Sequence, residues 1–216
     1  MLTFDHVFKR YPDAGEALSD VSFHLDKGEM AFLTGHSGAG KSTLLKLIAM
    51  IERSTRGQVL VDGQNLLQMH DRQIPLLRRK LGLIFQDYKL LFDQTVFDNV
   101  ALPLLVAGLG RHETAKRVRA ALDKVGLLSK EKKYPLALSG GEQQRVGIAR
   151  AVVNKPSIIL ADEPTGNLDP ELSAEIMRLF EQFQQVGVTA LIATHDIELI
   201  SHFEHKVLQL EQGRLK

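Results

Sequence analysis

The chain has 216 residues, a formal net charge of +1, and 44% hydrophobic residues. This composition is typical of a globular protein with a full core, and it indicates neither a basic nucleic-acid binder nor an acidic tail. No cysteine is present, which excludes disulfides, thiolate metal sites and cysteine nucleophiles. The first residues are too charged for a signal peptide and the apolar runs are short. We therefore expect a soluble chain whose role at a membrane comes through a partner.

The first 86 residues show strand patterns on both sides of one helix. Apolar residues at every second position predict half-buried antiparallel strands in residues 2–8 and 21–29. The continuous apolar run Met30–Thr34 predicts a buried strand, and a glycine-rich turn then leads into a helix over residues 41–51. Strand patterns recur in a hairpin that turns at Asp62-Gly63 and in the run Leu81–Phe85.

From about residue 88 to residue 156 the pattern is nearly all helical. Apolar positions recur at three- and four-residue steps, which indicates an amphipathic helix with one face formed by Ala115, Val118, Leu122 and Val125. A second helix is predicted over residues 142–153.

The last sixty residues have the pattern of a strand, a helix and a second strand. The strands are predicted at Ser157–Asp162 and Thr189–Thr194, with the helix over residues 170–187 between them. Two strands joined by a helix of this length pair in parallel. Residues 206–215 resemble a small hairpin, and His202 and His205 resemble a solvated helix face.

These patterns predict an α/β fold with a mostly parallel central sheet and an antiparallel sheet at the N-terminus. We expect one domain, residues 1–216, in which residues 1–86 and 157–216 form the core. A helical lobe, residues 87–156, interrupts this core.

Residues 35–42, GHSGAGKS, fit the phosphate-loop pattern G-x-x-x-x-G-K-[ST] between a predicted strand and a predicted helix. Glycines allow backbone N–H groups to surround phosphates, and the helix dipole attracts anions. Lys41 is expected to reach the β- and γ-phosphates, and the Ser42 hydroxyl to bind Mg²⁺. The nucleotide-binding set is Gly35, His36, Ser37, Gly38, Ala39, Gly40, Lys41, Ser42 and Thr43.

Two acids follow the predicted strand IILAD. Asp162 ends this buried strand, where a carboxylate can hold the water shell of Mg²⁺. Glu163 comes next and is the candidate to orient and deprotonate an attacking water. The alternative is a pair of solvated loop acids, which the phosphate loop in the same chain makes less favourable.

A second turn suited to anions occurs at residues 138–145, LSGGEQQR. Ser139, Gly140 and Gly141 precede a predicted helix, so their N–H groups could hold another phosphate oxygen. A serine cap at the start of a helix uses the same N–H groups, so the two interpretations are compatible.

The phosphate loop, LSGGEQQR, IILADEP, the GNLD of residues 166–169 and the Thr194–His195 pair occur in this order. Over the whole chain this set resembles the ATP-binding cassette ATPases, in which residues 138–142 are the signature. The resemblance implies that Tyr11 stacks on adenine, Gln86 contacts Mg²⁺ and the water, and His195 contacts the γ-phosphate. Tyr11 could instead be an edge-strand aromatic, Gln86 a strand end and His195 an ordinary histidine.

The resemblance also implies a head-to-tail homodimer with two ATPs at the interface. Ser139, Gly140, Gly141 and Glu142 of one copy then face the γ-phosphate held by the other, and Asp169 lies in the loop that crosses to the partner copy. Glu142 stands where many members of the family have glutamine, and it leaves the Ser–Gly–Gly turn intact.

The same resemblance implies an integral membrane partner that docks on the lobe, with residues 87–105 as the candidate surface. The sequences of residues 35–45 and 85–91 most resemble the bacterial cell-division branch of the family, whose members act at the cytoplasmic face of the inner membrane. Lipoprotein-release and macrolide-export members share LADEPTGNLD. A nucleic-acid or ribosome-associated role is the other alternative, but the chain shows no basic excess. A nucleotide-gated clamp with little ATP turnover is a third alternative.

Overall fold

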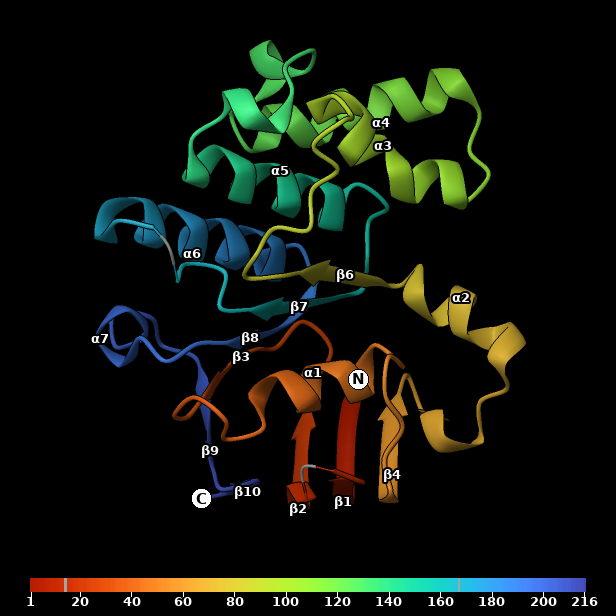
Figure 1. Cartoon of the computed structure of the whole chain (residues 1–216), viewed down its shortest axis with the longest axis vertical. Coiled ribbons are helices and arrows are strands. Elements are labelled where there is room, and N and C mark those ends of the chain that lie inside the picture. Colours follow the sequence, from red (N-terminus) through yellow and green to blue (C-terminus); the bar gives the residue numbers. More distant parts are fainter. Residues whose placement is uncertain (14, 167) are drawn as a thin grey trace.

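The computed structural model describes residues 1–13, 15–166 and 168–216. In this part of the chain the strands form two sheets (Figure 1). A four-stranded sheet has the order β2-β1-β4-β5, and a six-stranded sheet has the order β10-β9-β3-β8-β7-β6. The fold is therefore α/β with a mostly parallel main sheet, as the sequence predicts.

The four-stranded sheet is antiparallel throughout. Alternating residues of its two long strands are buried, which is the pattern expected where one face of a sheet covers a core. The predicted hairpin at Asp62-Gly63 is confirmed, with Val61 paired to Gln64. The strands are β1 (Leu2–Tyr11), β2 (Gly15–Leu25), β4 (Arg56–Val61) and β5 (Gln64–Asn65).

The six-stranded sheet is parallel except for its last hairpin. Four of its strands, β3, β6, β7 and β8, are the predicted apolar runs, and these run without alternation because both faces of the sheet are covered. The strands are β3 (Met30–Thr34), β6 (Leu81–Ile84), β7 (Ile158–Asp162), β8 (Thr189–Ala193), β9 (Lys206–Glu211) and β10 (Arg214–Leu215).

Helices cover both faces of this sheet (Figure 1). α1 lies between it and the four-stranded sheet, whereas α5 and α6 cover the other face and α3 and α4 lie beyond α5. The helices are α1 (Lys41–Ile48), α2 (Ile74–Arg78), α3 (Val96–Val106), α4 (Arg111–Lys124), α5 (Gly140–Val152), α6 (Pro170–Gln185) and α7 (Ile197–Ile200). Short 3-10 turns occur at Leu66–Gln68, Asp71–Gln73, Leu128–Lys130 and Pro135–Ala137.

Alternate residues of β3, β7 and β8 enter two different cores. In β3, Ala31 and Leu33 pack with α1 and the four-stranded sheet, whereas Met30 and Phe32 pack with α3, α5 and α6. The second core runs without interruption from the main sheet into the helical lobe. Each strand therefore ties the lobe side of the molecule to the phosphate-loop side.

The close contact between α5 and β6 depends on a glycine. A Cβ atom at Gly82 of β6 would lie 2.7 Å from the carbonyl oxygen of Ala151 in α5. This approach is far closer than a side chain permits, so the C-terminal end of α5 rests directly on the sheet. None of the helices in the described part of the chain combines the length and apolar character that a bilayer crossing requires.

Three details differ from the sequence-based expectations. On α4 the buried face includes Thr114 and Ala121, and Ala115 is only half-buried. The C-terminal hairpin is present, but β9 also pairs in parallel with β3. His205 is not on a solvated helix face, because it lies before β9, next to Glu181 and against the ring of Phe32.

Candidate nucleotide-binding site

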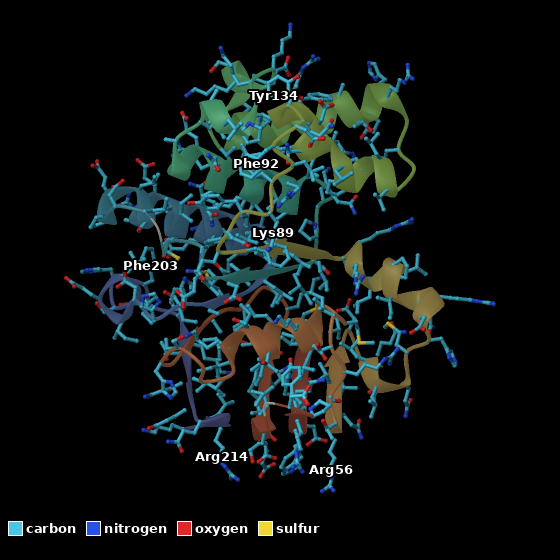
Figure 2. All side chains as sticks on the ribbon, viewed as in Figure 1. Arg56, Lys89, Phe92, Tyr134, Phe203 and Arg214 are labelled. Atoms are coloured by element: carbon cyan, nitrogen blue, oxygen red, sulfur yellow. The ribbon has the colours of Figure 1, made fainter. Side chains whose placement is uncertain are left out.

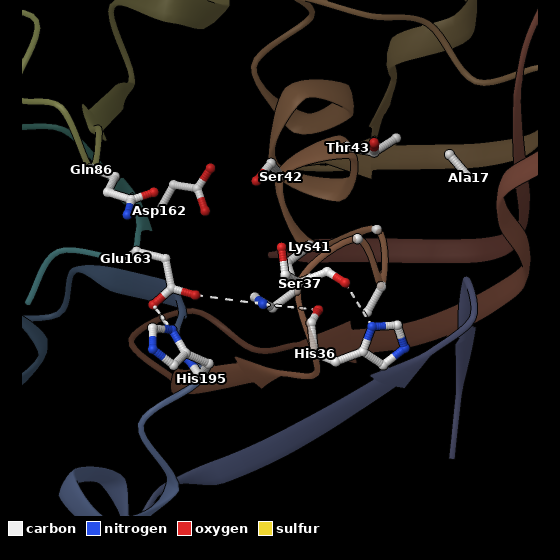
Figure 3. A pocket seen from close by; sticks show the side chains of 13 residues that line it. Ala17, His36, Ser37, Lys41, Ser42, Thr43, Gln86, Asp162, Glu163 and His195 are labelled. Carbon is white, nitrogen blue, oxygen red and sulfur yellow. Dashed lines mark hydrogen bonds and ion pairs between the residues drawn. The ribbon is translucent and has the colours of Figure 1, made fainter. Parts of the chain in front are cut away.

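A cavity of about 520 Å³ opens where β3 and β7 end (Figure 3). The loop between β3 and α1 surrounds it, and side chains from the ends of β6, β7 and β8 complete it. In parallel sheets the carboxyl ends of the strands are where ligands bind. The lining residues are Ala17, His36, Ser37, Gly38, Ala39, Gly40, Lys41, Ser42, Thr43, Gln86, Asp162, Glu163 and His195.

Two glycines allow the loop to take its path. Gly35 and Gly40 have φ angles of 148° and 109°. A Cβ atom would lie 2.2 Å from the Leu210 carbonyl oxygen at the first position and 2.6 Å from the Ala17 carbonyl oxygen at the second. Both clashes are with backbone, which cannot move aside, so any side chain here would displace the loop.

The Lys41 ammonium lies at the centre of the site, and its side chain is buried. Nζ donates to the carbonyl oxygens of Gly35, at 2.7 Å, and His36, at 3.3 Å. It also lies 3.5 Å from Oε1 of Glu163. The loop thus folds around its own lysine, which keeps the positive charge inside the cavity.

Glu163 lies between the Lys41 ammonium and the His195 imidazole (Figure 3). Its Oε2 is 2.9 Å from Nδ1 of His195, while its Oε1 faces Lys41. The backbone of Glu163 has a φ of 47°, in the left-handed region, and its N–H donates to the Ala193 carbonyl oxygen at 2.9 Å. Backbone strain of this kind occurs mainly where a fixed side-chain direction is needed.

Asp162 faces the first turn of α1. Burial raises the pKa of this carboxyl, and the Ser42 hydroxyl, which hydrogen-bonds to it, acts in the opposite direction. The neighbouring Glu163 raises the pKa further. A carboxylate destabilised in this way gains from a nearby cation.

Gln86 follows β6 and lines the same cavity, as the resemblance implies. Tyr11 does not line it: this residue ends β1, where the Lys9 ammonium lies 4.6 Å from its ring centroid. Its adenine-stacking role stays a prediction. Ala17, from β2, lines the cavity and was not predicted, since a small residue in a strand pattern gives no signal for a site.

The Ser139 turn lies outside this cavity, at the exposed start of α5. Its geometry is a capping box: Ser139 Oγ accepts from the N–H of Glu142 at 3.3 Å, and Glu142 Oε2 accepts from the N–H of Ser139 at 3.0 Å. Glu142 also pairs with Lys130. These contacts, with Lys130 first and the Ser139 N–H second, hold the pKa of Glu142 below its ordinary range.

Gly141 of α5 and Asp169 both contact Leu172 in the first turn of α6. A Cβ atom at Gly141 would lie 2.1 Å from Cδ2 of Leu172, so a side chain there would require Leu172 to move. Asp169 caps α6, its Oδ1 accepting from the Leu172 N–H at 3.0 Å. In the GNLD segment, Asn167 lies outside the described residues.

The sequence profile of the ABC transporter family matches residues 18–166. The protein named "Cell division ATP-binding protein FtsE" from Escherichia coli K12 is 60% identical over 215 residues, covering 100% of this chain and 97% of the relative. Proteins of the same name from Haemophilus influenzae and Bacillus subtilis are 52% and 44% identical, over 100% and 99% of this chain and 100% and 93% of theirs.

Solved structures agree with the sequence comparisons. A dimeric structure of MJ0796, described as a bacterial ABC transporter cassette, superposes with a TM-score of 0.92 at 35% identity, covering 100% of this chain and 97% of that one. A post-hydrolysis dimer of the ATP-binding cassette MJ0796, with ADP and Pi bound, has a TM-score of 0.91 at 34% identity and the same coverage. This chain therefore belongs to the ABC transporter family, as one of its ATPase cassettes.

Proposed function

We propose that the cavity binds ATP with Mg²⁺ and that Glu163 activates the water that attacks the γ-phosphate. The observation that carries this proposal is the group formed by Lys41, Glu163 and His195, which places a base between a phosphate-binding cation and a hydrogen-bonding imidazole. When a triphosphate enters, its γ-phosphate takes over the Lys41 ammonium. Glu163 then keeps His195 as its neighbour and can turn its free oxygen to the water.

The residues around Asp162 suit Mg²⁺. Ser42, Asp162 and Gln86 offer a hydroxyl, a carboxylate and an amide oxygen to one part of the cavity. Mg²⁺ prefers such oxygen ligands and keeps several waters and phosphate oxygens as well, so few protein ligands are needed. The ion, when bound, would supply charge stabilisation of the phosphates. Ser42 and Asp162 would hold it, and Gln86 would orient the water.

Hydrolysis by this chain requires a second copy in our proposal. The Ser139 turn is exposed and does not line the cavity of its own chain, so its N–H groups are available to a phosphate held elsewhere. The dimeric structures of a related cassette support a pair of copies, which we propose to be head-to-tail. Ser139, Gly140, Gly141 and Glu142 of one copy would then close the nucleotide site of the other, with Tyr11 on the adenine.

We further propose that the dimer drives or gates an FtsX-type integral membrane protein in bacterial cell division, where it controls cell-wall hydrolysis at the septum. The support is the identity of 44–60% to several cell-division ATP-binding proteins over nearly their whole lengths. In this proposal the protein acts at the cytoplasmic face of the inner membrane, peripherally, through that partner. Within the predicted docking segment 87–105, the side chains of Leu91 and Phe92 are apolar yet 43% and 47% exposed. Phe92 is labelled in Figure 2.

The variant Glu163→Gln tests the catalytic role. It keeps the size of the side chain but cannot accept a proton, so ATP turnover should fall by at least a hundredfold while ATP binding is preserved. ATP-bound dimers should accumulate and be visible by size-exclusion chromatography. Turnover at the parent rate would contradict the role given to Glu163.

The same variant tests the partner. Because it traps the ATP-bound dimer, a tagged copy expressed in a bacterium should retain its membrane protein when membranes are solubilised in detergent. The retained protein should be identified by mass spectrometry as FtsX-type. Recovery of a lipoprotein-release or macrolide-export membrane subunit instead would overturn the cell-division assignment and leave the ATPase assignment intact.

A further inference from the structure

Helix α5 is tied to the segment that follows Gln86 through Arg150. The two terminal nitrogens of this guanidinium donate to the carbonyl oxygens of Lys89, at 2.6 Å, and Tyr88, at 2.5 Å. Figure 2 shows Lys89 at the junction of the sheet and the helical lobe. Gln86, one of the residues that line the nucleotide cavity, is only two positions before Tyr88.

The segment held by Arg150 has an unusual backbone. Tyr88 and Lys89 have φ angles of 59° and 47°, so two consecutive residues other than glycine occupy the left-handed region. Such a pair is unfavourable by itself and persists only where neighbouring groups fix it. The planar guanidinium of Arg150 supplies this restraint, because it reaches both carbonyl oxygens at once in a geometry that an ammonium cannot match.

Partial burial strengthens the contact. Arg150 is half-buried, and desolvation lowers the pKa of its guanidinium, although arginine keeps its charge in proteins. No carboxylate within ion-pair distance is found for it among the described residues, so the two backbone oxygens are its main compensation. Loss of either side of the contact would leave partly buried polar groups without partners.

The same helix holds the segment that follows Glu163. Gln144, which is 1% exposed, donates its side-chain amide to the carbonyl oxygen of Pro164 at 2.6 Å. Its other side-chain atom, Oε1, is buried and has no hydrogen-bond partner in the described part of the chain. The hydrogen bond to Pro164 is therefore the contact that compensates the burial of this amide.

We propose that Arg150 and Gln144 are positioning residues, which couple the signature turn at Ser139 to Gln86 and Glu163 through one rigid helix. α5 begins at Ser139 and ends against β6, so a displacement of the turn is carried along the helix to both contacts. Engagement of Ser139 by the partner's nucleotide then moves Gln86 and Glu163 of the same chain. This inference rests on the proposed function and adds a route between its two sites.

The decisive variant is Arg150→Lys, which keeps the charge but loses the simultaneous contact to Tyr88 and Lys89. We expect kcat to fall about tenfold, with KM for ATP changed less than twofold, because one hydrogen bond to a charged group is lost at a residue that touches no nucleotide. In a Gln86→Ala background the same substitution should cause no further loss. An equal loss in both backgrounds would show that Arg150 does not act through Gln86 and would overturn the proposal.

A second measurement, which does not depend on ATPase activity, reports the stability of the backbone in the two segments. Hydrogen–deuterium exchange of residues 87–92 should become at least tenfold faster in Arg150→Lys, and that of residues 163–166 at least tenfold faster in Gln144→Met. Arg119→Lys and Gln184→Met are the matched controls, since Arg119 pairs with Glu131 in the lobe and Gln184 of α6 donates to the carbonyl oxygen of Gly28. Neither control should change exchange in these two segments. Unchanged exchange in Arg150→Lys would also overturn the proposal.

The two proposals fail in different ways. If the parent protein does not hydrolyse ATP, the proposed function fails, and the exchange experiment still shows whether α5 holds the two segments. If the parent hydrolyses ATP and Arg150→Lys matches it in kcat and in exchange, the ATPase stands and the coupling role is wrong. Thermal melting separates both results from unfolding, because a coupling effect requires a variant that stays folded at the assay temperature.

Discussion

The nucleotide cavity and the signature turn, which we propose as anion sites, both lie at the start of a helix, and the two are built differently. In the cavity, Lys41 already lies inside a ring of its own loop carbonyls and faces Glu163. At the signature turn, Ser139 and Gly140 are exposed, and the Glu142 carboxylate pairs with Lys130 and caps its own helix.

This difference supports our proposal that a single chain completes only one half of the catalytic site. The cavity contains a cation, a base and a carboxylate, which we propose bind a triphosphate. The signature turn offers N–H groups, but the Lys130 ammonium beside it is paired with Glu142, and a lone turn of this kind binds anions weakly. In our proposal the turn acts only when another copy brings a nucleotide to it, and the following substitutions test this division.

Ser139→Arg should have the largest effect, and it acts on the signature turn. A long side chain at the interface blocks closure, so turnover should fall about a thousandfold, the scale of assistance supplied in trans in other nucleotide hydrolases. Nucleotide affinity of the monomer, measured with a fluorescent ATP analogue, should stay within about twofold. Ser129→Arg, at an exposed site in the same lobe, is the control. An active monomeric Ser139→Arg protein would remove the need for a second copy.

Lys41→Ala should have the next largest effect, and it acts on the cavity. Removing the ammonium costs the charge-assisted hydrogen bonds to the phosphates, about 3 kcal/mol or roughly a hundredfold in ATP affinity of the isolated chain. Titration calorimetry measures this directly. Lys46→Ala, on the exposed side of the same helix, should bind ATP as the parent does. Equal affinities for the two variants would mean that the phosphates lie elsewhere.

Glu142→Gln should have the smallest effect, and it acts on stability with a defined pH dependence. The pKa of Glu142 is lowered, so its pairing stabilises the fold above the ordinary value of 4.5 and is lost as the pH falls through the lowered pKa. Glutamine can still accept from the Ser139 N–H but cannot pair with Lys130. At pH 7 the variant should be about 0.5 kcal/mol less stable.

Thermal melting at several pH values checks the Glu142 prediction. The parent should melt about 1–2 °C higher than Glu142→Gln at pH 7, and the two curves should converge in acid. A constant difference at all pH values would show that the ion pair with Lys130 is not its source. ATP turnover should change little, because the Ser–Gly–Gly turn is the same in both proteins.

The sequence was sufficient wherever local pattern decides the structure. The continuous apolar runs at β3, β7 and β8 predict buried strands from composition alone. The phosphate loop and the strand and helix beside it are predicted from glycine and lysine at fixed spacing. The hairpin at Asp62-Gly63 was equally clear. The division into a core of residues 1–86 and 157–216 and a lobe of residues 87–156 stays a prediction, because one apolar core crosses that boundary.

What the sequence did not predict depends on contacts between distant segments. β9 alternates like a hairpin strand, and nothing local shows that Phe32 of β3 pairs with Val207. His205 was misjudged for the same reason, since Phe32 and Glu181 reach it from other elements. Arg150 and Gln144 lie in an ordinary helix pattern, and the only available signal was a polar residue at a position that the helical period assigns to the buried face.

The close approach of Gly35 to Leu210 has a consequence for biosynthesis. The phosphate loop is made early, but the backbone that it rests on belongs to β9, and the Gly213 N–H donates to the Ala39 carbonyl oxygen at 3.1 Å. A growing chain on the ribosome therefore cannot give this loop its final shape until residue 213 has emerged from the exit tunnel. In our proposal a growing chain that has not yet made β9 could therefore not hold a nucleotide at this loop.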